Sequence, residues 1–170
     1  MGISNDLCSQ KYNISREDQD RYAAESYRRA LSAVTAGTFV DEIVPVMIPQ
    51  RKGEPIAFKQ DECPRETSYE LLAKMSPAFQ KSGVATAGNA SVISDGAAAL
   101  VVMSAKKAAE LGIKPIARVT GYAQAAVKPL ELFTAPIFAV RRLMHKLDVT
   151  IDYFDLIEVN EAFASQTIAD

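Results

Sequence analysis

The stretch ATAGNASVISDGAAALVVMS, residues 85–104, places a run of small residues directly before a continuous apolar run. Small side chains over residues 87–91 let a backbone bend tightly, while amide N–H groups and the Ser91 hydroxyl stay available as hydrogen-bond donors. Residues 97–103 have the composition of a strand covered on both faces. Two interpretations stay open: a turn that packs against another segment, or a backbone that a ligand approaches closely.

Helix boundaries are marked on both sides of this stretch. Ser15 precedes acidic residues at positions 17 and 18, which is typical of an N-cap, and Gly37 is a suitable C-terminal stop. A short helix over residues 69–75 ends before Pro77. The sequence therefore predicts helices from Ser15 to Gly37, Tyr69 to Met75, Ser104 to Gly112 and Pro136 to Leu147.

Strand-like segments alternate with these helices. The polar residues 50–66 predict a surface excursion, and Pro45 restricts the segment before it to a sheet edge or bulge. The expected strands are Glu42–Ile48, Ala97–Met103, Ile116–Ala123 and Phe154–Val159. This alternation predicts an α/β fold with a largely parallel sheet.

The segment NEAFA, residues 160–164, directly follows the last expected strand and is expected to open a helix. In α/β proteins this is a common place for ligand-binding groups. Asn160 could cap the helix, or its amide could hold a water or a carbonyl oxygen.

The composition excludes several classes of partner. The formal net charge is −2 and the pI is near 5.5, so neither nucleic acid nor an anionic membrane surface is expected as a partner. No stretch reaches the roughly 18 apolar residues that a membrane span needs, and residues 1–15 lack the order of a signal peptide. The expected location is the cytoplasm or an organelle matrix.

Few side chains of this sequence are suited to metal or nucleophilic chemistry. His145 is the only histidine, which excludes a histidine-cluster metal site, and it is interpreted as a solvated helix residue. Cys8 and Cys63 lack metal-ligand spacing and the setting of an activated thiol, so both are expected to be reduced, unreactive thiols. No metal and no cofactor is predicted.

The motifs TAGNAS…DGAAALVVMS and EVNEAFA together resemble the thiolase family, the acetyl-CoA acyltransferases. Further stretches fall in the family's order: SREDQDRYAAESYRRALSA, GTFVDEIVPV, LLAKMSPAF and LGIKPIARV. The resemblance implies a thiolase-like α/β fold fragment in three parts. Residues 1–93 would be the loop domain that covers coenzyme A, residues 94–114 the last β-α unit of the N-terminal domain, and residues 115–170 the start of the C-terminal domain.

The resemblance also implies roles for individual residues. Coenzyme A, as an acyl thioester, is implied as the substrate, with Arg65 at its adenine-nucleotide end, where a guanidinium suits a phosphate. Asn160 matches the asparagine that holds an oxyanion-hole water for the thioester carbonyl. The other implied ligand-contacting residues are Met1, Phe79, Ala87, Gly88, Ser91, Leu132, Ala162 and Phe163.

The family's reaction is a Claisen condensation of acyl-CoA thioesters, or its reverse, through a cysteine-bound acyl group. The sequence departs from the family here, because the C-[GS]-S-G, C-x-G-G and GHP motifs that carry the catalytic cysteines and histidine do not occur in it. The isolated chain is therefore expected to be inactive. A non-catalytic fragment that binds coenzyme A or a partner stays an alternative, and NEAFA disfavours a ketoacyl synthase.

The family resemblance places the parent enzyme in fatty acid metabolism and implies a homo-oligomer for the full-length protein. Leu132 and Phe133 are implied near the acyl pocket. Both short-chain acetoacetyl-CoA chemistry and longer β-oxidation substrates stay open.

Overall fold

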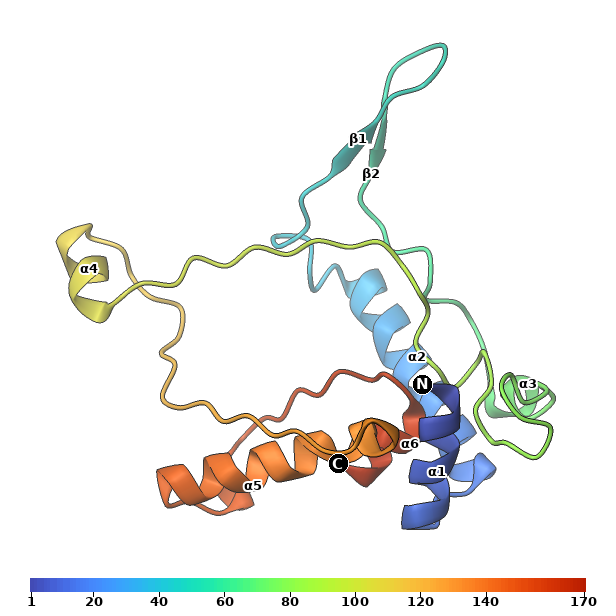
Figure 1. Cartoon of the computed structure of the whole chain (residues 1–170). Helices are drawn as coiled ribbons and strands as arrows, with labels where there is room; N and C mark the ends of the chain where they lie inside the picture. Colours follow the sequence, from blue (N-terminus) through green and yellow to red (C-terminus); the bar gives the residue numbers. More distant parts are fainter. The chain divides into compact units, whose positions relative to one another are not determined.

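A computed structural model describes all 170 residues, which divide into two compact units (Figure 1). Unit 1 consists of Met1–Val92 and Asn160–Ala169, and unit 2 of Ile93–Val159 with Asp170. None of the helices is both long enough and apolar enough to cross a membrane.

Unit 1 is built from four helices and one hairpin. Helix α6 packs against both α1 and α2, and α2 also packs against α3 (Figure 1). The core between them is small, and it includes the side chains of Cys8, Ala23, Leu72, Ala85 and Phe163. The helices are α1 (Gly2–Tyr12), α2 (Arg16–Ala36), α3 (Tyr69–Leu72) and α6 (Ala164–Ala169).

The predicted boundaries of α2 are confirmed. The Ser15 hydroxyl oxygen accepts a hydrogen bond from the Asp18 amide at 3.0 Å, and the Asp18 carboxylate accepts one from the Ser15 amide at 3.0 Å. This reciprocal capping box satisfies two helix-end donors. Gly37 ends the helix with φ of 67°, a left-handed conformation that favours glycine.

The only sheet is an antiparallel hairpin of β1 (Val46–Ile48) and β2 (Ile56–Phe58), with Val46 opposite Phe58. The expected strand over residues 42–48 is thus confirmed only in its last three residues. Pro45, which lacks an N–H for the ladder, lies immediately before β1. The second strand lies inside the polar stretch of residues 50–66, which was predicted as a surface excursion.

Unit 2 contains two α-helices and two 3₁₀ helices. The Ser104 hydroxyl oxygen accepts from the Lys107 amide at 3.1 Å and caps α4, and Pro136 is the second residue of α5, so both predicted helices are confirmed. The elements are α4 (Ala105–Glu110), η1 (Pro129–Thr134), α5 (Ala135–Leu147) and η2 (Ile151–Tyr153).

The segment before η1 runs beside α5. Arg142 donates to the Gln124 carbonyl at 2.8 Å, and the Lys146 ammonium donates to the Tyr122 carbonyl at 3.3 Å while lying 4.5 Å from the Tyr122 ring centroid. These contacts from the charged face of α5 hold an extended segment that makes no strand ladder of its own.

Three expected strands are not formed. Segments 97–103, 116–123 and 154–159 carry no strand pairing, and most of their apolar side chains are exposed, with Leu100 at 91%, Ile116 at 105% and Leu156 at 93%. A β-strand is defined by hydrogen bonds to a neighbouring strand, and no other segment of this chain pairs with these three as a strand. The expected burial of residues 97–103 on both faces, and the expected parallel sheet, are therefore wrong for this chain.

Candidate functional site

The two motifs singled out in the sequence meet within unit 1. Ala90 and Phe163 form an isolated antiparallel bridge. The Ser91 amide donates to the Ala162 carbonyl at 3.0 Å, and the Ala164 amide donates to the Asn89 carbonyl at 2.9 Å. Residues 89–91 are thus joined through the backbone to residues 162–164, although more than 70 residues separate them along the chain.

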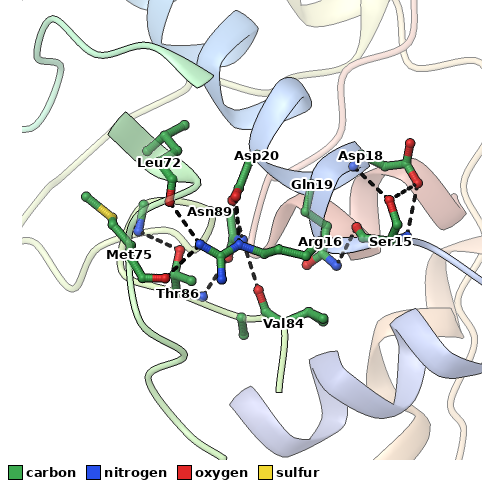
Figure 2. Close-up of polar contacts among 12 residues, drawn as sticks. Ser15, Arg16, Asp18, Gln19, Asp20, Leu72, Met75, Val84, Thr86 and Asn89 are labelled. Carbon is green, nitrogen blue, oxygen red and sulfur yellow. Dashed lines mark hydrogen bonds and ion pairs between the residues drawn. The ribbon is translucent and has the colours of Figure 1, made fainter. Parts of the chain in front are cut away.

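Asn89 is the centre of the small-residue turn. Its side chain is only 3% exposed; the amide oxygen accepts from the Thr86 N–H at 2.7 Å, and the amide nitrogen donates to Asp20 at 3.0 Å and to the Val84 carbonyl at 3.1 Å (Figure 2). One buried side chain therefore closes the turn and ties it to α2. Because buried polar groups require partners, this network fixes the conformation of residues 84–89.

Arg16 ties α3 to the same face of α2. Its guanidinium donates to the Asp20 carboxylate at 2.7 Å and to the carbonyls of Leu72 at 2.9 Å and Met75 at 2.8 Å (Figure 2). The charge of the buried Asp20 carboxylate is thereby paired.

Neighbouring side chains leave no room for a residue larger than glycine at position 88. A Cβ at this position would lie 2.5 Å from a methyl carbon of Leu72 and 2.7 Å from the Met75 sulfur. This close approach supports packing as the reason for the glycine. Ala87, which precedes Gly88, is exposed, and so is Ser91. The side chains of both residues are therefore accessible.

Aromatic residues lie at the other side of the bridge. The rings of Phe79 and Phe163 meet edge to face with centroids 6.1 Å apart, and a Cβ at Gly2 would overlap the Phe79 ring. Met1 is 73% exposed and precedes Gly2 in the chain. The predicted site residues Met1, Phe79 and Phe163 are therefore gathered in one region of unit 1.

A hollow of about 240 Å³ lies between α2, the turn of residues 88–92 and the loop at residues 63–64. Ser91 and Pro64 line it, and the exposed Arg65 follows Pro64 in the chain. Tyr22 and Ser26 line its α2 side.

Asn160 does not cap a helix, because α6 begins at Ala164. It is exposed, and its carbonyl accepts from the Ala162 amide at 3.0 Å, which makes a tight turn before the bridge. The Ala162 amide also donates to the Gln166 side chain at 3.2 Å. The expectation that the helix starts directly after Asn160 is wrong, and the segment is instead a turn held by its own backbone and by α6.

The partners of Glu161 were not predicted from the sequence. The Tyr22 hydroxyl donates to one Glu161 carboxylate oxygen at 2.5 Å, and the Ser26 hydroxyl donates to the other. Burial first, and then the hydrogen bond to Glu161, raise the pKa of Tyr22 to about 12. The available signal was the spacing of Tyr22 and Ser26, two hydroxyl residues at i and i+4 of the predicted helix.

The remaining predicted residues lie in unit 2 or outside any cluster. Leu132 is exposed and Phe133 is buried within η1. His145 is exposed on α5, as expected. Neither Cys8 nor Cys63 forms a disulfide; the first is buried and the second exposed. No group of three or more potential metal ligands occurs.

Solved structures share this arrangement over nearly the whole chain. The crystal structure of the acetyl-CoA acetyltransferase of Bacillus anthracis superimposes with a TM-score of 0.95 at 44% identity, covering 99% of this chain and 43% of that one. The structure from Syntrophomonas wolfei gives a TM-score of 0.90 at 37% identity. The protein therefore has part of the α/β fold of these acyltransferases, as the sequence predicted.

The family follows from the sequence matches. The N-terminal thiolase domain matches residues 1–106 and the C-terminal thiolase domain matches residues 113–170. The chain belongs to the thiolase family, a family of acyltransferases.

Named relatives are similar over the same segment. The acetyl-CoA acetyltransferase of Pseudomonas aeruginosa is 49% identical over 170 residues, and that of Syntrophomonas wolfei is 50% identical over 169 residues. A probable acetyl-CoA acyltransferase of Staphylococcus aureus is 46% identical. The chain spans 43%, 42% and 43% of the lengths of these three relatives.

Proposed function

We propose that this chain supplies the coenzyme A-facing surface and the oxyanion asparagine of a thiolase that transfers acyl groups between coenzyme A thioesters. The observation that carries the proposal is the backbone pairing of residues 89–91 with residues 162–164. This pairing brings the small-residue turn and the NEAFA segment to one place in unit 1.

In this proposal the pantetheine arm lies along the exposed surface of the turn. Ala87 and Ser91 contact it, while Gly88 packs inward against Leu72 and lets the turn take its shape. The aromatic region of Phe79 and Phe163, with Met1 and Ala162 beside it, lines the apolar part of the path. Arg65 and Leu132 are proposed for the nucleotide and acyl ends respectively.

Asn160 is proposed as the hydrogen-bonding group for the oxyanion. During the condensation, negative charge develops on the thioester oxygen of acetyl-CoA when its methyl carbon loses a proton. A fixed amide that holds a water against this oxygen stabilises the charge, and losing one such donor typically costs on the order of a hundredfold in rate. The cysteines and histidine of the family reaction are not among these 170 residues.

Thiolytic cleavage of 3-ketoacyl-CoA and condensation of two acetyl-CoA molecules are the two directions of the proposed reaction. We also propose a homo-oligomer in the cytoplasm or an organelle matrix, without nucleic-acid or membrane partners, in keeping with the net charge of −2. The proposal keeps the division into a loop domain over residues 1–93, a last β-α unit of the N-terminal domain over residues 94–114, and the start of the C-terminal domain over residues 115–170.

Isothermal titration of the purified chain with coenzyme A tests the binding surface. Ser91→Trp fills the proposed pantetheine path and should abolish binding. Ser32→Trp places the same side chain on an exposed position of α2 away from the hollow, and should leave binding unchanged. Equal binding by both variants, or no binding by a folded wild-type chain, would contradict the proposed surface.

A non-catalytic coenzyme A-binding fragment is the second candidate function, favoured by the lack of the three catalytic motifs in the sequence. It predicts the same titration result. Complementing the chain with the missing thiolase segments separates the two, because only the first candidate predicts acyl transfer after complementation.

A further inference from the structure

The side chain of Glu161 connects the NEAFA segment to α2. One of its carboxylate oxygens accepts from the Tyr22 hydroxyl at 2.5 Å, and the other accepts from the Ser26 hydroxyl. Tyr22 and Ser26 are four residues apart on α2 and therefore lie on one face of the helix. Hydrogen bonds to an ionised acceptor are stronger than those between neutral groups.

The same helix also holds the partner segment. Asp20 accepts from the Asn89 side chain at 3.0 Å, and Asn89 stands at the start of residues 89–91, which pair with residues 162–164 (Figure 2). Helix α2 thus carries one anchor for each half of the backbone pair: Asp20 for residues 89–91, and the two hydroxyls for residue 161.

Without Glu161, the turn at residues 160–162 has few other attachments. The Ala162 amide contacts the Asn160 carbonyl and the Gln166 side chain, and both of these acceptors lie on the same C-terminal stretch of chain. Besides the Ser91 bond to the Ala162 carbonyl, the bonds of Glu161 tie this turn to the body of unit 1.

The two donors keep their protons at neutral pH. Burial, together with the bond to Glu161, raises the pKa of Tyr22 to about 12, and a serine hydroxyl does not ionise in water. Both hydroxyls therefore remain hydrogen-bond donors throughout the physiological range of pH.

We propose that Glu161 is a positioning residue: through the hydroxyls of Tyr22 and Ser26 it fixes the turn that presents Asn160. This inference rests on the proposed role of Asn160 at the oxyanion. In this proposal Glu161 makes no contact with the substrate. Its carboxylate determines the position of the neighbouring side-chain amide of Asn160.

Native-state hydrogen exchange, measured by NMR on the ¹⁵N-labelled full chain without coenzyme A, tests the role. The reporters are the amides of Ser91 and Ala164, which cross the backbone pair, and the side-chain amide of Asn160. The reference is the Ala73 amide, which bonds to the Tyr69 carbonyl at 2.8 Å in the same unit. Local opening exposes the reporters without unfolding the reference.

In Glu161→Ala, exchange at Ser91 and Ala164 should accelerate about tenfold, as expected for losing two exposed hydrogen bonds of modest strength. The Asn160 side-chain resonance should shift, and exchange at Ala73 should stay unchanged. A second variant, Tyr22→Phe with Ser26→Ala, removes the donors and should reproduce this result. In Glu161→Gln the effect should be smaller, because the amide oxygen still accepts.

Unchanged exchange at Ser91 and Ala164 would overturn the proposal. So would equal acceleration at Ala73, because this would show that the carboxylate stabilises the whole unit and does not position the turn. Since no coenzyme A is present in the measurement, its result is independent of the titration that tests the binding surface.

Discussion

Replacing Asn89 by alanine should destabilise unit 1 more than any other single change at the site. The substitution removes hydrogen bonds to the Thr86 amide, the Val84 carbonyl and the Asp20 carboxylate, at 2.7, 3.1 and 3.0 Å. Thr86 and Asp20 are fully buried, so water cannot replace the lost partner. Two neutral bonds at about 1 kcal/mol each and one charged bond at about 2 kcal/mol give a loss of about 4 kcal/mol.

Urea unfolding followed by far-UV circular dichroism measures this loss. With a slope of roughly 2 kcal/mol per molar urea, the midpoint should fall by about 2 M. The matched control is Asn160→Ala, the same substitution at an exposed position, which should change the free energy of unfolding by less than about 0.5 kcal/mol. If the two variants have the same midpoint, Asn89 does not hold the turn and the reasoning fails.

Three further outcomes are expected. Gly88→Ala should lower the melting temperature in calorimetry, at a cost of about 1–3 kcal/mol, because its Cβ would lie 2.5 Å from a Leu72 methyl carbon. The control Gly96→Ala, whose Cβ would have nothing within 4 Å, should leave the melting temperature unchanged. Equal melting temperatures for the two variants would refute the packing argument. Since the pKa of Tyr22 is raised from 10.0 to about 12, the contribution of Tyr22 to stability should be complete below pH 10 and disappear as the pH rises through 12. Tyr22→Phe should remove this dependence when the unfolding midpoint is measured as a function of pH. A profile that Tyr22→Phe leaves unchanged would contradict this prediction. The purified chain should not cleave acetoacetyl-CoA with free coenzyme A, and turnover above that of a mock purification would disprove this expectation.

The parts of the fold that were predicted correctly depend on neighbours in the sequence. Ser15 and Asp18 form a reciprocal cap three residues apart at the start of α2, and the Ser104 hydroxyl accepts from the Lys107 amide at the start of α4. Such signals act over one helical turn and need no distant partner. The resemblance of the two motifs to thiolases is likewise contained in short words of sequence, and the family matches confirm it.

The predicted strands fail for the opposite reason. Residues 97–103 have a strand composition, yet Leu100 is 91% exposed because no segment of the chain pairs with it. A strand is a property of two segments, and composition describes only one of them.

For the candidate site, the family resemblance predicts which residues act together, including Ser91 and Asn160, and local sequence signals predicted the bounds of α2 beside them. Only the tertiary structure decided that residues 89–91 pair with residues 162–164, that Gly88 is small to admit Leu72, and that Glu161 takes its two hydroxyl partners from α2. These contacts join residues more than a dozen positions apart. Their formation depends on how the helices pack, because a side chain's partner across such a distance is set by three-dimensional position and not by its neighbours in the chain.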